Sequence, residues 1–213
     1  MPVEPPPDCQ LCPRLVGFRR DNQAAYPEFH NAPVPSFGPI DAGVLVVGLA
    51  PGLKGANQTG RPFTGDGAGD MLYPALIKAG FAQGSYGRSA DDGLRLVGCR
   101  ITNAVRCVPP QNRVTGAEAA TCRPFLIAEI EAMANLRVLL ALGRVAHEAI
   151  LRTFGLRLAD YPFAHDAMHD LPNGLIMADS FHCSRYNVNT GRLTEPMFSA
   201  VLQSVRTLVD GVR

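Results

Sequence analysis

The stretch VLVVGLAPG, residues 44–52, decides the fold. Four consecutive apolar residues that end in glycine predict a strand buried on both faces, as in a parallel sheet covered by helices. The residues that follow, up to about Asp70, are rich in Gly, Pro and Asn and predict a long loop at the carboxyl end of that strand. Glycines in such a loop let the backbone approach a ligand closely. We therefore expect Gly48, Ala50 and Gly52 to line a binding site.

Outward from this stretch, apolar runs alternate with helical segments. Three more strands are predicted, at residues 98–105, 137–142 and 174–178. Helices are predicted at residues 71–80, 117–134, 143–154 and 194–209, the first with Pro74 near its first turn or at a bend, and the last with Thr194 as its N-cap. This alternation predicts an α/β three-layer sandwich with a central four-stranded, mainly parallel sheet flanked by helices. Ligands of such sheets bind at the carboxyl ends of the strands, here near Gly48, Asn103, Gly143 and Asp179.

The composition predicts a folded protein without a membrane segment. The chain has 213 residues, of which 46% are hydrophobic, and its net charge is +1. We expect one domain over residues 1–213, with a proline-rich, extended arm at residues 1–40. No apolar run reaches the length of a membrane span, and the N-terminus lacks the pattern of a secretory signal. We expect a cytoplasmic monomer that does not bind membranes, although the small net charge weighs mildly against nucleic-acid binding.

Four of the six cysteines form two pairs. Cys9 and Cys12 make a C-x2-C pair in the arm, and Cys107 and Cys122 follow far downstream. Four thiolates suit a tetrahedral zinc site or an iron–sulfur cluster, and spacing alone does not separate the two. Four unrelated buried thiols are the alternative, although a C-x2-C pair beside prolines makes a poor core segment. Cys99 lies inside a predicted strand and is expected to be a core thiol.

Three strand-end loops carry further motifs. The first loop continues as GRPFTGD (residues 60–66), the second contains NAVRCVPPQN (103–112), and the fourth contains HCSRYNVNTGRLT (182–194). Together with GLAPG, these motifs resemble those of the B-type (family 5) iron–sulfur uracil-DNA glycosylases, in the uracil-DNA glycosylase superfamily. The resemblance covers nearly the whole chain, from Cys9 to about Phe198. It implies a [4Fe–4S] cluster whose ligands are Cys9, Cys12, Cys107 and Cys122, and only this resemblance favours iron–sulfur over zinc.

The resemblance also implies an activity, the removal of uracil and related deaminated bases from DNA. A base inside a duplex must be flipped out before its glycosidic bond is reachable. Phe63 matches the residue that stacks on the flipped base, and Asn103 matches the one whose amide complements N3–H and O4 of uracil. His182 matches the histidine that donates to O2 as negative charge develops on the base. Asp66 matches an aspartate proposed to activate water, with Asp70 in reserve, although Asp70 is the better candidate for capping the next helix.

The loop at residues 182–192 matches the segment that enters the duplex in this superfamily. Arg185 and Tyr186 are expected to fill the gap left by the flipped base, because an aromatic ring or a guanidinium can replace a vacated stack. Asn187 and Arg192 are expected to contact the DNA beside them. The partner implied is therefore DNA that contains uracil or another deaminated base.

At three positions, the residue in this sequence differs from the one that this family or a related family usually has. Cys183 stands where this family usually has proline, so the histidine loop loses a fixed φ and gains an N–H. Ala50 stands where several other families have Asp or Asn, so a carboxylate elsewhere must position the water. Gly52 stands where a uracil-specific family has tyrosine, which predicts an open pocket and a broad substrate range. The alternatives are a damaged-DNA-binding iron–sulfur protein of the same fold without turnover, and a sheet protein with a regulatory cluster.

Overall fold

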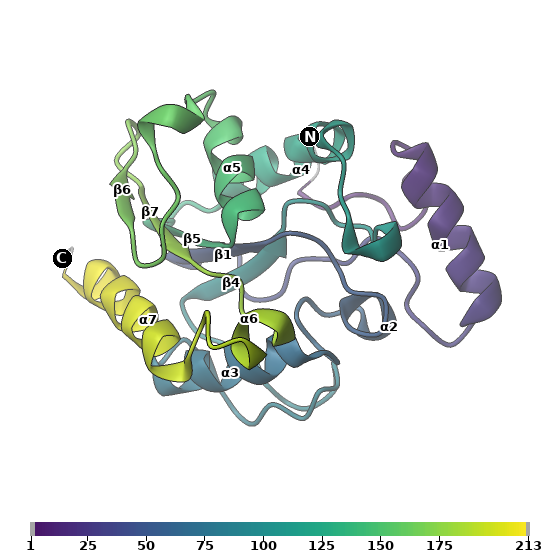
Figure 1. The fold of residues 1–213 in the computed structure, drawn as a ribbon, viewed down its shortest axis with the longest axis horizontal. Coiled ribbons are helices and arrows are strands. Elements are labelled where there is room, and N and C mark those ends of the chain that lie inside the picture. Colours follow the sequence, from purple (N-terminus) through teal and green to yellow (C-terminus); the bar gives the residue numbers. More distant parts are fainter. Residues whose placement is uncertain (1–2, 212–213) are drawn as a thin grey trace.

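The central sheet has five strands, in the order β4-β1-β5-β7-β6, in the computed structural model, which describes residues 3–211 (Figure 1). Strands β4, β1, β5 and β7 run parallel, and β6 lies antiparallel to β7 at one edge. These strands are β1 (Val44–Gly48), β4 (Cys99–Asn103), β5 (Val138–Leu142), β6 (Met168–Asp170) and β7 (Ile176–Ser180). A separate antiparallel pair consists of β2 (Ala82–Gln83) and β3 (Arg95–Leu96).

The four predicted parallel strands and the α/β class are confirmed, and β6 is the addition to the predicted sheet. This strand has only three residues, and Met168 and Asp170 at its two ends are exposed. A strand without an apolar run or a clear alternation gives no periodic signal, which is why the sequence does not predict it. Edge strands of this kind are commonly short and polar.

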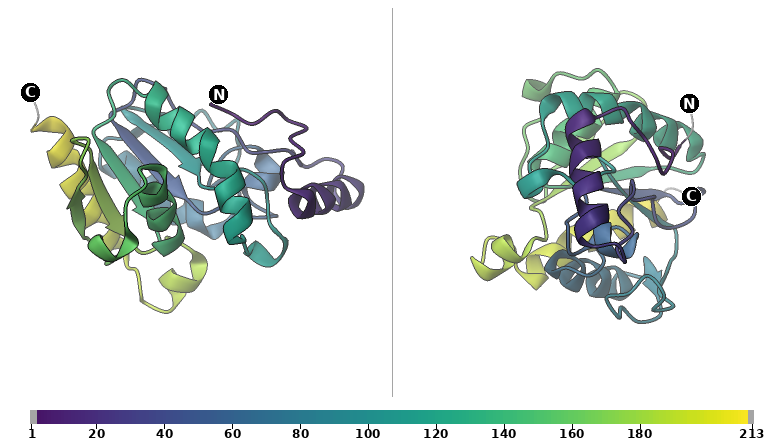
Figure 2. Two further views of the ribbon diagram at one scale, coloured as in Figure 1. Left: turned by 90° about the horizontal axis from the view of Figure 1, so that it is seen from above. Right: turned by 90° about the vertical axis from the view of Figure 1, so that its right-hand side faces the viewer.

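Side chains of β1 alternate between two cores. Val44 and Val46 face a core shared with α3 (Gly67–Lys78) and α7 (Glu195–Asp210), whereas Leu45 and Val47 face a core shared with α4 (Gly116–Ala132) and α5 (Arg144–Thr153). The two helix pairs cover opposite faces of the sheet (Figures 1 and 2). Each of these four side chains is at most 1% exposed, and burying one contributes about 1.5–3 kcal/mol. In the described part of the chain, no helix combines the length and apolarity that crossing a membrane requires.

Helix α3 begins earlier than the predicted start at residue 71. Its N-cap is Asp66, whose backbone is extended and whose side chain accepts a hydrogen bond from the Ala68 amide. The expectation that Asp70 caps the helix is therefore wrong, because Asp70 lies inside the first turn and pairs with Arg88 instead. Pro74 lies in the helix interior, where its missing N–H removes one helical hydrogen bond. The other predicted helices are confirmed, and Thr194 caps α7 as expected.

The N-terminal segment is not extended throughout, which corrects the expected arm at residues 1–40. Within it, α1 (Pro13–Ala25) is helical, and residues 1–2 lie outside the described residues. Pro13 at the first helical position has its φ preset for a helix, and Leu15 and Val16 bury one face of α1. The helix stands beyond one end of the layered body (Figure 2). Further along, short helices follow at α2 (Ala56–Thr59) and α6 (Arg185–Asn189), with single 3-10 turns at Pro110–Asn112 and Leu158–Asp160.

Candidate active site and cysteine cluster

The strand-end loops meet at one edge of the sheet, as the parallel order requires. Gly48 and Asn103 end β1 and β4 as direct neighbours, and the Gly143 amide after β5 donates to the Ser180 carbonyl at the end of β7 at 2.8 Å. These ends surround a cleft of about 660 Å³, and an inner pocket of about 40 Å³ shares Gly52 and other walls with it. With the exception of Gly48, every residue expected in base binding or catalysis lines this inner pocket.

Phe63 and Asn103 form one wall of the inner pocket, and Gly48 makes room for both. A Cβ on Gly48 would lie 2.5 Å from Asn103 Oδ1 and 2.5 Å from Phe63 Cζ, so any side chain there would displace them. Phe63 holds a left-handed backbone conformation, with φ of 53°, which is unusual for a bulky residue and indicates a strongly determined position. Its ring lies 5.9 Å from the ring of His182, with 31° between the planes.

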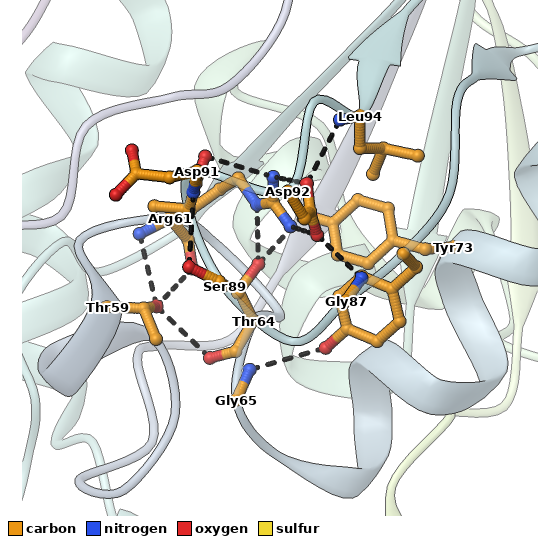
Figure 3. A network of polar contacts seen from close by, with 12 residues as sticks. Thr59, Arg61, Thr64, Gly65, Tyr73, Gly87, Ser89, Asp91, Asp92 and Leu94 are labelled. Carbon is orange, nitrogen blue, oxygen red and sulfur yellow. Dashed lines mark hydrogen bonds and ion pairs between the residues drawn. The ribbon is translucent and has the colours of Figure 1, made fainter.

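A buried ion pair supports the loop that carries Phe63 (Figure 3). Both terminal nitrogens of Arg61 donate to Asp92, at 2.8 and 2.7 Å, and the two side chains are 5% and 6% exposed. The Arg61 guanidinium lies 5.2 Å from the ring centre of Tyr73, and its Nε donates to the Thr64 hydroxyl at 2.8 Å. A two-pronged Arg–carboxylate pair fixes orientation as well as charge. The loop is thereby anchored on both sides of Phe63.

Asp66 has two separate surroundings for its two oxygens. Oδ1 caps α3 by accepting from the Ala68 amide at 3.0 Å. Oδ2 faces the first loop, because a Cβ on Gly52 would lie 2.9 Å from it and one on Gly55 closer still. Among the described residues, none donates a hydrogen bond to Oδ2. Burial raises the pKa of Asp66, and the amides of Ala68 and Gly69 oppose that rise.

His182 follows β7 and is held from several sides. The Asn187 side-chain amide donates to the His182 carbonyl at 2.8 Å, and a Cβ on Gly143 would lie 3.2 Å from the His182 Cβ. Cys183, at the position of the family's proline, is fully buried in the core below α3 and α7. Burial lowers the pKa of His182 to about 4, so the ring is neutral at physiological pH and carries one N–H donor.

The residues expected to contact DNA lie on and around α6, and the structure shows what each already touches. Arg185 lies against the start of α3 and lines the cleft, and Tyr186 is 73% exposed. The Arg192 guanidinium covers the Phe181 ring at 4.6 Å. The Asn187 amide is bonded to the His182 carbonyl, as described above, so it holds the histidine loop from within.

The four paired cysteines surround one small cavity beside α1. The cavity brings the C-x2-C pair of the N-terminal segment together with the two cysteines from far downstream, which makes a donor set of four sulfurs. Burial raises the pKa of Cys12 to about 11 and of Cys107 to about 12, so thiolates there require the charge of a bound metal. Four cysteine sulfurs around one cavity are a donor set that fits an iron–sulfur cubane. Cys99 is a core thiol, as expected.

One other group of ligand-type side chains occurs in the described residues, formed by His147, His169 and Asp179. His147 Nδ1 lies 2.8 Å from Asp179 Oδ1, and His169 Nε2 lies 3.2 Å from Asp179 Oδ2. His147 Nε2 is bonded to the Tyr161 carbonyl at 2.9 Å. Two nitrogen or oxygen ligands of one zinc stand about 3.3 Å apart, so the pair at 2.8 Å is a direct hydrogen bond. The group braces α5, β6 and β7 below the histidine loop.

Several residues of the cleft, Lys54 and Asn112 among them, are missing from the sequence-based site. Lys54 and Asn112 both line the cleft. Asn112 belongs to the quoted motif NAVRCVPPQN, and its φ of 55° indicates a tight turn, so the motif itself was the available signal. Lys54 is one of only two lysines, which on its own indicates nothing about position.

Comparison with known proteins agrees with this geometry. The family model described as "Uracil DNA glycosylase superfamily" matches residues 35–206. The type-5 uracil-DNA glycosylase of Thermus thermophilus is 45% identical over 205 residues, covering 94% of this chain and 93% of the relative. The type-5 enzymes of Pyrobaculum aerophilum and Mycobacterium tuberculosis are each 39% identical, covering 92% and 94% of this chain and 87% and 78% of the relatives. This chain therefore belongs to the uracil-DNA glycosylase superfamily and, within it, to the type-5 uracil-DNA glycosylases.

Proposed function

We propose that this protein hydrolyses the N-glycosidic bond of uracil and related deaminated bases in DNA and leaves an abasic site for base-excision repair. The observation that carries the proposal is the inner pocket, in which a flat aromatic ring, a side-chain amide, a neutral imidazole and a carboxylate meet within one small space. Gly52 adds no side chain to that space, which favours acceptance of hypoxanthine and xanthine besides uracil. None of the six cysteines, all of which the structure describes, forms a disulfide, and this suits the reducing cytoplasm.

Recognition of the base follows from two buried side chains. The Phe63 ring offers a stacking surface for a base that has left the duplex. Asn103 is 3% exposed at the end of β4, and its amide has both a donor and an acceptor for O4 and N3–H of uracil. A base without this pattern would leave a buried polar group unpaired, which costs about 1–3 kcal/mol. The pocket therefore selects by hydrogen bonding as well as by shape.

Bond cleavage places a negative charge on the base and a positive charge on the sugar, and the pocket has a group to stabilise each charge. As the bond between the base nitrogen and the sugar C1′ breaks, its electron pair leaves with the base, and the neutral His182 donates a hydrogen bond to O2. The free Oδ2 of Asp66 faces the cationic sugar and orients the water. The water hydroxyl joins C1′, its proton passes to Asp66, and the released base takes a proton from solvent. Capping by Oδ1 keeps the carboxylate oriented throughout.

Contacts with DNA are proposed for the exposed rim around α6. Arg185 and Tyr186 project from the first turn of α6, next to the cleft, where they suit the gap left by the base. Arg192, in the same loop, and Asn187 are proposed to contact the DNA beside them. The enzyme is proposed to be a monomer. Lys54 at the opposite rim adds a positive charge for phosphate.

We further propose that Cys9, Cys12, Cys107 and Cys122 hold a [4Fe–4S] cluster. The four cysteines around one cavity support this proposal, and the family resemblance favours iron–sulfur over zinc. Such a cluster would supply structural cross-linking here. Cys107 begins the loop whose next turns include Asn112 at the cleft, so the cysteines hold this wall of the cleft against α1.

Asp66→Asn tests the enzymatic role directly. Asparagine is as good an N-cap as aspartate, so α3 and the melting temperature should be retained. Loss of the charge should lower single-turnover base release from a uracil oligonucleotide by two or more orders of magnitude, on the order of 3 kcal/mol of barrier. Uracil-DNA affinity should stay near that of the unchanged protein. The matched control is Asp70→Asn, which removes an exposed carboxylate from the same helix turn.

Two results would count against this assignment. Near-normal turnover of Asp66→Asn with loss in Asp70→Asn would transfer the role to Asp70. An unchanged protein that binds uracil-DNA tightly yet never releases base would instead make it a damaged-DNA-binding protein.

A further inference from the structure

Arg19 is a buried cation whose surroundings differ from those of the other buried arginines. Arg19, Arg61 and Arg106 are 4%, 4% and 1% exposed. Arg61 pairs with Asp92, and Arg106 pairs with two carboxylates, including Glu129 at 2.5 Å. Within residues 3–211, no carboxylate forms a salt bridge with Arg19. A buried guanidinium without a negative partner costs several kcal/mol, so an anion is expected beside it.

The atoms that Arg19 does touch belong to two cysteines of the proposed cluster. Its Nη1 donates to Cys107 Sγ at 3.8 Å, and its Nη2 donates to the Cys9 carbonyl at 2.8 Å. Cys9 precedes α1, Arg19 lies on α1, and Cys107 follows β4, so one guanidinium fork joins two distant parts of the chain.

We infer that Arg19 is a positioning residue of the cysteine cluster: its guanidinium is the charge partner of the anionic cluster and hydrogen-bonds a ligand sulfur. The inference rests on the proposed [4Fe–4S] cluster. Four thiolates outweigh the charge of the cubane and give it a net negative charge, which supplies the partner that Arg19 lacks among the side chains. The fork then fixes Cys107 Sγ and the Cys9 backbone at once, as a single point charge cannot.

Two measurable consequences follow for the cluster. Hydrogen bonds to ligand sulfurs and nearby positive charge stabilise the reduced, more negative state, so they raise the reduction potential. They also hold the ligands in place, and losing such outer contacts typically weakens metal binding by about 10–100-fold. Removing the charge should therefore lower the potential, and removing the fork should speed the loss of iron.

The variants separate charge from geometry. Arg19→Gln keeps an N–H donor and removes the charge, whereas Arg19→Lys keeps the charge and removes the fork. The control is Arg20→Gln, because Arg20 is exposed on the same helix and, within the described residues, its side chain hydrogen-bonds only Gln10 Oε1, at 3.5 Å. All four proteins are purified anaerobically, and their iron content, visible spectrum and reduction potential are measured. Iron release to a ferrous chelator is then followed by loss of visible absorbance.

Arg19→Gln should show a more negative potential and iron release faster by about 10–100-fold. Arg19→Lys should release iron faster with a potential near that of the unchanged protein, and Arg20→Gln should match the unchanged protein in both. If Arg19→Gln does not fold, wild-type iron release in Arg19→Lys overturns the inference. Wild-type potential and iron release in Arg19→Gln overturn it as well. An unchanged protein without iron would instead refute the proposed cluster, which keeps the two failures distinct.

Discussion

Position 48 has no room for any side chain larger than that of glycine, and this steric limit shapes the proposed base-binding site. The space where its side chain would lie is occupied by Asn103 Oδ1 and the Phe63 ring, each 2.5 Å from an ideal Cβ. Both neighbours are buried, and neither is the flexible end of a long side chain. A single methyl group therefore acts directly on the two residues proposed to hold the base.

Gly48→Ala should lower both activity and stability. Overpacking of this kind costs about 1–3 kcal/mol, and displacement of the amide and the ring should lower base release at least tenfold, about 1.4 kcal/mol of barrier. Single-turnover kinetics and thermal unfolding measure the two effects. Gly17→Ala is the control, because Gly17 is an exposed position inside α1 with open space around it. That change should stabilise α1 by about 1 kcal/mol and leave activity unaltered. Normal kinetics in Gly48→Ala would mean that Phe63 and Asn103 do not hold the base as proposed.

Among the elements, the loop between α2 and α3 depends on a support that is distant in the sequence. The Arg61–Asp92 pair lowers the pKa of Asp92 well below its ordinary value of 3.8, chiefly through the Arg61 hydrogen bonds. Because the folded-state pKa is depressed, the pair contributes its full stability above about pH 4. That contribution is lost as the pH falls further.

Asp92→Asn should therefore destabilise the protein at pH 7 and somewhat less at pH 3, where the carboxyl is protonated in the unfolded chain but still ionised in the folded protein. Removal of one partner from a buried pair costs about 3–5 kcal/mol, because Arg61 keeps its charge without compensation. Denaturant unfolding at the two pH values gives the difference. The matched control, Asp70→Asn, breaks the exposed pair with Arg88 and should cost about 0–1 kcal/mol. Equal losses at both pH values would refute the ionic role of Asp92.

Helix α6 is the element proposed to enter the duplex. Replacing Arg185 and Tyr186 together with Ala should reduce activity most on well-paired duplexes, since a single-stranded base needs no gap filled behind it. Base release from matched duplex and single-stranded uracil substrates measures the contrast. Arg157→Ala, at an arginine whose side chain is 81% exposed outside this loop, serves as the control. An equal loss on both substrates would indicate a simple electrostatic role.

The elements also differ in how far sequence reveals them. The sequence predicts β1, β4, β5 and β7, because a strand buried on both faces is largely apolar and can be recognised from that pattern alone. The sequence does not predict the start of α3, because Asp66 and Asp70 are both plausible N-caps. Packing of Asp66 against Gly52 and Gly55 is a tertiary contact, and it favours Asp66 as the cap. Strand β6 and the Arg61–Asp92 pair depend on tertiary contacts without a local pattern. The site residues come from motif resemblance, whereas Arg19 has no motif and becomes visible only through its contacts.

For the whole molecule, the proposed cluster would join a segment outside the layered body to the edge of the active site. Helix α1 also contacts the body through Arg14, which pairs with Glu118 of α4 at 2.7 Å. Near the N-terminus, Glu4 pairs with Arg106 at 2.7 Å. These contacts are few and partly exposed, whereas β1 and β5 at the centre of the sheet are buried throughout. Opening of the N-terminal segment is therefore expected at lower free energy than global unfolding.

Cys107→Ala should accordingly separate local from global stability. Loss of this ligand should remove iron and free α1, so limited proteolysis should cut first within residues 3–25 while the sheet resists. The melting temperature should fall as well, because binding of the metal is part of the folding free energy. Cys99→Ala is the matched control: Cys99 is fully buried in β4, outside the cluster, so that variant should keep its iron and lose only about 0.5–3 kcal/mol. Protease-resistant α1 and a full iron content in Cys107→Ala would show that the arm is held by its ion pairs alone, whereas iron loss in both variants would trace the effect to general destabilisation.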